Sequence, residues 1–266
     1  MRKCSLDKMQ SVFAQIASDK ALYLPVDNKD GRAEYTKWSE GAEWSNALNT
    51  VRSPKDFFFP QTEDLMKFKT EGKNIEIIDV RSESEDFVVF GVRACDVKSF
   101  DVLDRVFLTA PRDSFYAMKR EQGIIVSLAC TKPAETCFCG TFGIDAADPK
   151  GDITVWDVED GYVFRANTAK GEALMATCAD LFEETDGKAV EAAQEKLHAI
   201  MAKLPLAYLT TAGLGAGMTK EFFDRPEWAT LSESCLGCGT CTFVCPTCQC
   251  YDIRDFDTGH GIQRFR

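Results

Sequence analysis

Four cysteines toward the C-terminal end have a spacing that can hold an iron–sulfur cluster. They are separated by two, two and three residues, and a proline follows: Cys235, Cys238, Cys241, Cys245 and Pro246. This is the bacterial ferredoxin spacing, in which thiolates ligate iron. Gly237 and Gly239 carry no Cβ, so backbone N–H groups can approach the cluster sulfurs there. Zinc motifs usually separate two cysteine pairs by about 12–20 residues, so the spacing favours iron and sulfide over zinc.

The fourth cysteine of this run raises the question of which cluster it ligates. In two-cluster ferredoxins the fourth cysteine of such a run ligates the other cluster, which requires a second run of the same kind. No second run occurs within the 266 residues. Cys245 could close its own cluster, Cys248 or Cys250 could replace it, or a second motif could follow residue 266. We expect the last of these.

A second group of cysteines is predicted to converge at the edge of a sheet. Cys95 follows one predicted strand and opens a helix, and Cys130 ends another strand. If these strands are neighbours, their ends bring the two thiols together, and the loop over 131–136 can return Cys137 and Cys139 to the same point. Four thiolates complete a [4Fe–4S] cluster. A four-thiolate zinc site and simple packing are the alternatives.

Two cations and two further cysteines near these groups are open to more than one interpretation. Arg93 and Lys98 flank Cys95, where they could offset the charge of a cluster or lie in solvent as ordinary surface cations. Cys4 and Cys178 lie in predicted helices without partners, and we expect them to be small buried hydrophobic residues.

Hydrophobic periodicity predicts the elements that position these cysteines. The order strand, helix, strand around Cys95 and Cys130 indicates a small α/β domain. We therefore predict an α+β fold, with a mixed α/β domain over residues 1–205 and a C-terminal ferredoxin-like iron–sulfur module over 206–266. The predicted helices are 5–18, a short one capped by Thr62, 95–107, 171–184 and 188–204; the predicted strands are 22–26 paired with 31–38, 75–80 and 87–92 with a turn at 81–86, 123–130, and a hairpin over 152–167.

Composition excludes several classes of function. The formal net charge is −11, which argues against a nucleic-acid partner because phosphate contacts need clustered Lys and Arg. No segment approaches the ~20 apolar residues of a membrane helix, and the first residues do not resemble a secretory signal. We expect a cytoplasmic protein. Twelve cysteines in a reducing compartment indicate metal binding or redox chemistry, and two histidines exclude a His-rich site.

Three longer segments carry a family resemblance, and FFFPQTE (57–63) also fits it. They are GVRACDVKSFDVLDRVF (91–107), CTKPAETCFCGTFG (130–143) and FFDRPEWATLSESCLGCGTCTFVCPTCQCYDIRDF (222–256). Together they resemble the family of iron–sulfur electron-transfer subunits found in anaerobic sulfite reductases and, as the β subunit, in cytosolic sulfhydrogenases. The resemblance implies a cluster on Cys95, Cys130, Cys137 and Cys139. It also implies a dicluster ferredoxin module, whose second motif normally follows within the next hundred residues.

We therefore expect an electron-transfer subunit with two or more [4Fe–4S] clusters and no catalytic site of its own. By resemblance, its neighbours would be a flavoprotein subunit that binds FAD and NAD(P)H and a catalytic subunit of hydrogenase or sulfite reductase type. Two rival functions remain: a structural or regulatory zinc protein, and an iron–sulfur enzyme whose cluster binds substrate. Cluster potentials span roughly −700 to +450 mV, so the sequence does not fix the direction of electron flow.

Overall fold

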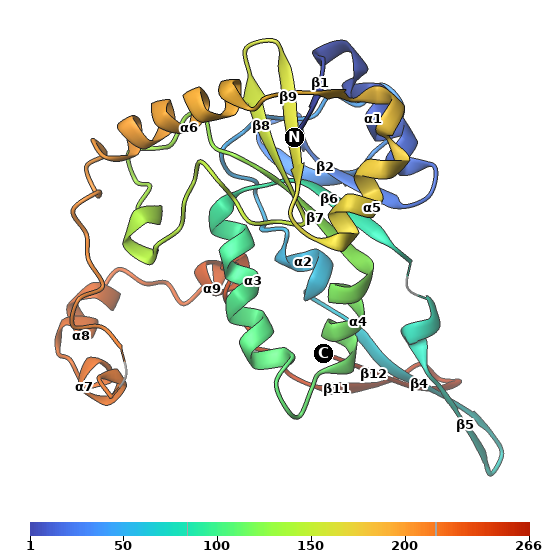
Figure 1. Ribbon diagram of the computed structural model, residues 1–266. Helices are drawn as coiled ribbons and strands as arrows, with labels where there is room; N and C mark the ends of the chain where they lie inside the picture. Colours follow the sequence, from blue (N-terminus) through green and yellow to red (C-terminus); the bar gives the residue numbers. More distant parts are fainter. Residues whose placement is uncertain (84, 216) are drawn as a thin grey trace.

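One eight-stranded mixed sheet organises the larger part of the molecule (Figure 1). The computed structural model describes residues 1–83, 85–215 and 217–266. Strands β2, β6, β7 and β8 run parallel, and the strands beyond them at both edges are antiparallel to their neighbours. From one edge to the other the order is β10 (Glu183–Glu184), β1 (Arg2–Cys4), β9 (Gly161–Ala166), β8 (Ile153–Val158), β7 (Gly123–Leu128), β6 (Phe87–Val92), β2 (Ala21–Asp27) and β3 (Ala33–Lys37).

Helices cover both faces of this sheet, which explains why β6 and β7 are buried along their whole length. Successive side chains of a strand point to opposite faces. Val88 and Phe90 of β6 pack with α1 (Met9–Ala17) and α5 (Ala169–Thr177). Phe87 and Val89 pack in a second core. That core includes residues of α2 (Lys55–Phe58), α3 (Ala94–Phe107) and α4 (Ser114–Gln122).

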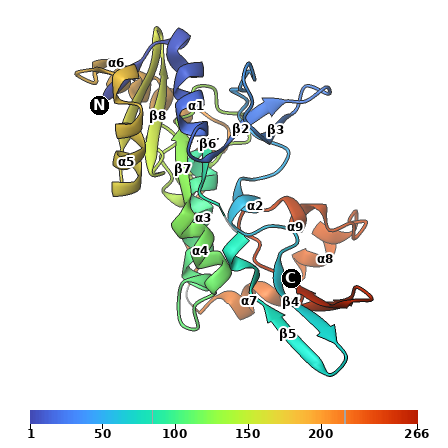
Figure 2. The ribbon, with the colours of Figure 1, turned by 90° about the vertical axis from the view of Figure 1, so that its right-hand side faces the viewer.

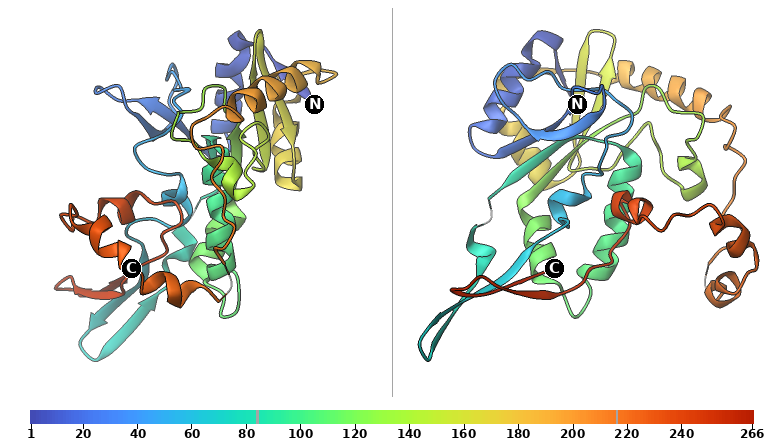
Figure 3. Two further views of the ribbon diagram at one scale, coloured as in Figure 1. Left: turned by 90° about the vertical axis from the view of Figure 1, so that its left-hand side faces the viewer. Right: turned by 180° about the vertical axis from the view of Figure 1, so that it is seen from behind.

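A second, four-stranded antiparallel sheet joins two segments that are far apart in the sequence. Its order is β11 (Arg254–Asp257), β12 (Gly261–Phe265), β4 (Asp64–Glu71) and β5 (Asn74–Ile78). In β12, Ile262 lies opposite Phe68 of β4. Figure 3 shows this sheet at the end of the molecule away from the N-terminus. Residues 206–266 therefore share a sheet with residues 64–78.

The segment between the two sheets begins with a long helix, α6 (Lys188–Met201), which packs beside β8. Three short helices follow: α7 (Thr219–Phe223), α8 (Glu227–Ser232) and α9 (Thr240–Val244). Figure 2 shows these helices and the small sheet at the same end of the molecule, but Figure 1 shows α7 and α8 well apart from β4 and β5. Over the described residues, none of the helices combines the length and apolar character that a membrane crossing requires. The 3-10 turns are Leu6–Lys8, Val80–Glu83, Cys139–Phe142 and Ala179–Leu181.

The α+β fold class is confirmed, as are most predicted elements of the main sheet. These include α1, the pairing of β2 with β3, β6, α3, β7 and α6. The predicted hairpin is β8–β9, which turns at residues 159–160. Cys4 and Cys178 are buried in the apolar core, as expected, although Cys4 ends strand β1 and is not helical.

Three further expectations are wrong. Thr62 caps no helix, because α2 ends at Phe58 and strand β4 begins at Asp64. Strands β5 and β6 lie in different sheets and form no hairpin; of the turn predicted between them, Ser84 lies outside the described residues. The helix predicted over 171–184 ends at Thr177, and the chain then returns as β10.

Candidate iron–sulfur sites

The fold brings four cysteines together at one edge of the main sheet. Strands β6 and β7 are parallel neighbours, so their carboxyl ends lie side by side. Cys95 follows β6 in the first turn of α3, and Cys130 follows β7. Cys137 lies in the next loop, and Cys139 begins a 3-10 turn. The four thiols are within electrostatic reach, because neighbouring thiols in this group contribute to the raised pKa values of Cys95, Cys130 and Cys139.

Three of these thiols, those of Cys95, Cys130 and Cys139, have raised pKa values and hold their protons without metal. Solvent reaches Cys95, yet the surrounding protein desolvates its thiol enough to raise the pKa to about 12, and the carboxylate of Asp96 adds to the effect. Desolvation and the thiols of Cys137 and Cys130 raise the pKa of Cys139 to about 11. Metal binding must therefore release protons from these groups. Among the described residues, no three Cys, His, Asp or Glu side chains are already arranged around a common metal position.

Arg93 places a buried positive charge beside this group. Its side chain donates hydrogen bonds to the carbonyl oxygens of Ala129 (3.0 Å), Asn46 (3.0 Å) and Ala47 (2.9 Å) and to Asn46 Oδ1 (2.8 Å). Desolvation raises the pKa of the Cys130 thiol, and Arg93 works against it. Lys98 instead is exposed and pairs with Asp101 (2.7 Å). Of the two cations that flank Cys95, only Arg93 belongs to the site.

The environment of Arg93 tests whether an anionic cluster fits here. In the described part of the chain, its Nε has no hydrogen-bond partner and no carboxylate lies within 4 Å of its guanidinium. The charge of Arg93 opposes the rise that burial causes in the pKa of Asp96 and Asp157, but neither carboxyl group pairs with it directly, and a buried charge without a direct ion-pair partner is costly. A cluster held by four thiolates is anionic and would offset that cost. The residues present therefore fit an iron–sulfur group.

The C-terminal run lies on an exposed loop that leads into and out of α9. Gly237 and Gly239 have φ angles of 68° and 75°, a left-handed backbone that glycine adopts without strain. The backbone N–H of Gly237 donates to Cys235 Sγ at 3.4 Å. A backbone N–H thus reaches a cysteine sulfur, as expected. Cys245 and Cys248 are half-buried; the exposed cysteines are Cys235, Cys238, Cys241 and Cys250.

Hydrogen bonds to threonine act on two of these thiols. The Cys238 thiol donates to Thr240 Oγ1 at 3.3 Å, and its pKa is lowered by side-chain and backbone hydrogen bonds of Thr240. Burial raises the pKa of Cys245, but hydrogen bonds with Thr247 and the charge of Lys55 outweigh it and leave that pKa lowered. A lowered pKa favours the thiolate, which is the form of cysteine that ligates metal.

Polar side chains from α2 and the loop after it hold this run against the rest of the molecule. Lys55 Nζ donates to the carbonyl oxygens of Cys245 (3.0 Å) and Cys248 (3.3 Å). Gln61 Nε2 donates to the carbonyl oxygen of Phe243 at 3.3 Å. A pocket of about 560 Å³ separates the two parts, and Lys55, Cys248 and Cys250 lie on its wall. The part of the run from Phe243 to Cys248 is therefore fixed to the α/β layers.

Arg266 forms a second anchor beside the same pocket. Its guanidinium pairs with Glu63 (2.7 Å) and with Asp113. It also lies over the rings of Phe59 (5.0 Å) and Tyr251 (5.3 Å). Sequence reasoning missed both Lys55 and Arg266. The hydrogen-bond partners of Lys55 are 190 and 193 residues away along the chain. Those of Arg266 are 203 and 153 residues away. No local sequence pattern therefore marks either residue.

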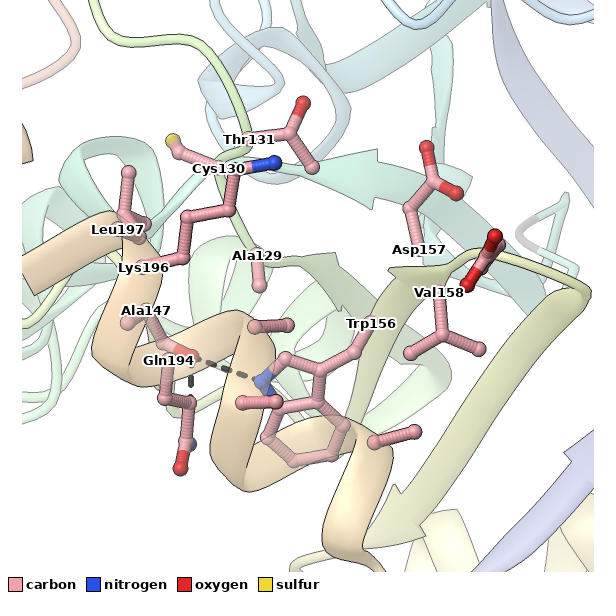
Figure 4. A pocket seen from close by; sticks show the side chains of 14 residues that line it. Ala129, Cys130, Thr131, Ala147, Trp156, Asp157, Val158, Gln194, Lys196 and Leu197 are labelled. Atoms are coloured by element: carbon pink, nitrogen blue, oxygen red, sulfur yellow. Dashed lines mark hydrogen bonds between the residues drawn. The ribbon is translucent and has the colours of Figure 1, made fainter.

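A second pocket, of about 530 Å³, opens beside Cys130 (Figure 4). It lies between α6 and the end of β8. Trp156 forms part of it, and the Trp156 indole donates to the carbonyl oxygen of Ala147 at 2.7 Å. Cys130, one of the four cysteines at the edge of the main sheet, thus borders a cavity.

Comparison with known proteins agrees with the site chemistry. Residues 234–266 match the family model of the 4Fe-4S dicluster domain. Over 209 residues the chain is 35% identical to the protein named Sulfhydrogenase 2 subunit beta from Pyrococcus furiosus. The chain is thus similar to that β subunit over most of its own length. The family resemblance is confirmed, and so is a C-terminal 4Fe–4S domain. The alignment covers 77% of this chain and 59% of the length of the relative. No solved structure matches the chain.

Proposed function

We propose that this chain is an iron–sulfur subunit that relays electrons within a cytoplasmic oxidoreductase complex. One [4Fe–4S] cluster would be held in residues 1–205 and one in residues 206–266. The ligands of the first would be Cys95, Cys130, Cys137 and Cys139. Those of the second would be Cys235, Cys238 and Cys241, with Cys245 as the fourth ligand that these 266 residues offer in place of one from a second motif. When bound, such clusters supply one-electron redox chemistry.

The observation that carries this proposal is the pairing of each cysteine group with a buried cation. Arg93 and Lys55 are 6% and 4% exposed, and each lies beside one group of thiols. Within the described residues, neither cation has a carboxylate at salt-bridge distance. Because a buried cation needs a counter-charge, two anionic centres are favoured over two sets of neutral thiols. A zinc ion on four thiolates would also be anionic, so metal analysis has to separate the two.

The name of the relative supports a place in a complex. That protein is a sulfhydrogenase β subunit. We infer a flavoprotein that binds FAD and NAD(P)H on one side and a catalytic subunit of hydrogenase or sulfite reductase type on the other. The exposed cysteines of the C-terminal run would place their cluster near the surface, where a partner can exchange electrons with it.

Anaerobic quantitation of iron and acid-labile sulfide, with EPR spectra after dithionite reduction, tests the proposal. We expect about eight irons per chain, four for each cluster. Cys137→Ala and Cys241→Ala should each lose about four irons. Cys178→Ala removes a buried cysteine outside both groups and should keep all eight. Zinc without sulfide in the wild-type chain would refute the proposal.

A further inference from the structure

Lys55 is a lysine in an environment where lysine is rare. It begins α2, and its side chain is almost fully buried, with the residue 4% exposed. Lysine is almost never fully buried unless it is paired. The hydrogen bonds that its ammonium group makes go to two carbonyl oxygens, those of Cys245 and Cys248. Carbonyl oxygens accept hydrogen bonds but do not neutralise a charge.

The nearest carboxylate in the sequence has another partner. Asp56 pairs with Arg52 at 3.3 Å. Across the described residues, no Asp or Glu forms an ion pair with Lys55. The ammonium group instead lies on the wall of the pocket that Cys248 and Cys250 share. A buried, uncompensated cation facing a group of thiols is the arrangement expected around an anionic centre.

The charge of Lys55 lies beside the C-terminal run, because its Nζ is 3.0 Å from the carbonyl oxygen of Cys245 and 3.3 Å from that of Cys248. Its hydrogen bonds also hold the turn from Cys245 to Cys248 at a fixed distance from the charge. The side chain of Lys55 thus both positions the turn from Cys245 to Cys248 and supplies the positive charge beside it.

We propose that Lys55 is a positioning residue that raises the reduction potential of the cluster on the C-terminal run. Reduction adds one electron to a site that is already negative, and a fixed cation in a region of low dielectric constant favours the form with the extra charge. The inference rests on the proposed function, because it needs a cluster at this run. It goes beyond the proposed function because it attributes the reduction potential of one cluster to Lys55, which lies about 190 positions before Cys245 in the chain.

Redox titration of the full chain, followed by EPR under anaerobic conditions, tests this inference. Lys55→Gln keeps a hydrogen-bond donor and removes the charge. It should make the C-terminal cluster about tenfold harder to reduce, which is about 59 mV for one electron. Lys55→Arg keeps the charge and should stay near the wild-type potential. Lys220→Gln removes one exposed cation from α7 and should change nothing. The cluster beside Arg93 is the internal control.

Each outcome decides between the alternatives. Equal potentials in the wild type and Lys55→Gln would overturn the inference while leaving the proposed function intact. If Lys55→Gln loses four irons, iron retained in Lys55→Arg supports the role of the charge, and iron lost from both variants overturns it. A wild-type chain that binds no iron and sulfide would refute the proposed function, and the inference with it.

Discussion

Replacing Arg266 with methionine should destabilise the fold by more than any surface substitution nearby. Arg266 and Glu63 are 4% and 5% exposed at their side chains and form a pair at 2.7 Å. Removing one partner of a buried pair typically costs about 3–5 kcal/mol, because the other charge stays buried. Lys119 also pairs with Glu63, at 2.6 Å, so we expect the lower end of that range.

The expected change can be measured by thermal unfolding at neutral pH. A loss of about 3 kcal/mol should lower the Tm by about 6–12 °C for a chain of this size. Arg254→Met is the matched control, because Arg254 and its partner Asp252 are both 70% exposed and such pairs contribute little to stability. The double variant Arg266→Met with Glu63→Gln should recover part of the loss. A Tm for Arg266→Met no lower than that of Arg254→Met would refute this account of the anchor.

Two further predictions concern the same region. Burial raises the pKa of Asp113, but hydrogen bonds from Arg266 and from the backbone of Tyr116 and Phe115 outweigh it, so the folded pKa is lowered. This stabilisation is present above the unfolded aspartate pKa of about 3.9 and is lost as the pH falls through the folded value. Below about pH 4, the Tm of Asp113→Asn should therefore fall less steeply with decreasing pH than the Tm of the wild type. Parallel curves for the two proteins would contradict the assignment. Gly261→Ala would place a Cβ 1.9 Å from the carbonyl oxygen of Phe68, whereas the Cβ of Gly259→Ala meets no atom within 4 Å. Hydrogen exchange in β4 should become faster in Gly261→Ala than in Gly259→Ala, and equal rates would show that β12 does not depend on this close approach.

The elements that sequence reasoning predicted correctly are those whose partners are close in the chain. The hairpin β8–β9 has a short turn and alternating side chains, and α3 has a helical apolar stripe. Strand β4 was missed although one partner, β5, is local and pairs with it from Glu71 opposite Asn74 onward; its pairing with β12, which begins at Gly261, has no signal near residue 64. Helix α4 was also missed, although a local signal exists. Asp113 Oδ1 accepts hydrogen bonds from the N–H groups of Phe115 (3.0 Å) and Tyr116 (2.9 Å), the pattern of a helix N-cap.

For the candidate sites, spacing identified the thiols and the fold supplied their surroundings. A ferredoxin-type run can be recognised from four cysteines alone, because the ligands of one cluster are local. The two buried cations, Arg93 and Lys55, cannot be recognised from the sequence in this way. Arg93 is close to Cys95 in the region that the sequence singled out, but only the packing of the Asn46 loop shows that it is buried. Lys55 has no sequence signal at all, since its function depends on a turn that arrives about 190 residues later.

The small sheet also sets an order of events during synthesis of the chain. Strands β4 and β5 leave the ribosome early, but the edge of β4 that pairs with β12 stays open until residue 265 has been made. Contacts between such distant segments form late and slowly, and an unpaired edge invites association with other chains. Lys67, Lys69 and Lys73 along this hairpin place charges near the open edge, the kind of protection that exposed edges commonly carry. Only when β12 arrives is the C-terminal cysteine run brought against Lys55. Cluster insertion at that run would therefore follow the pairing of β12 with β4.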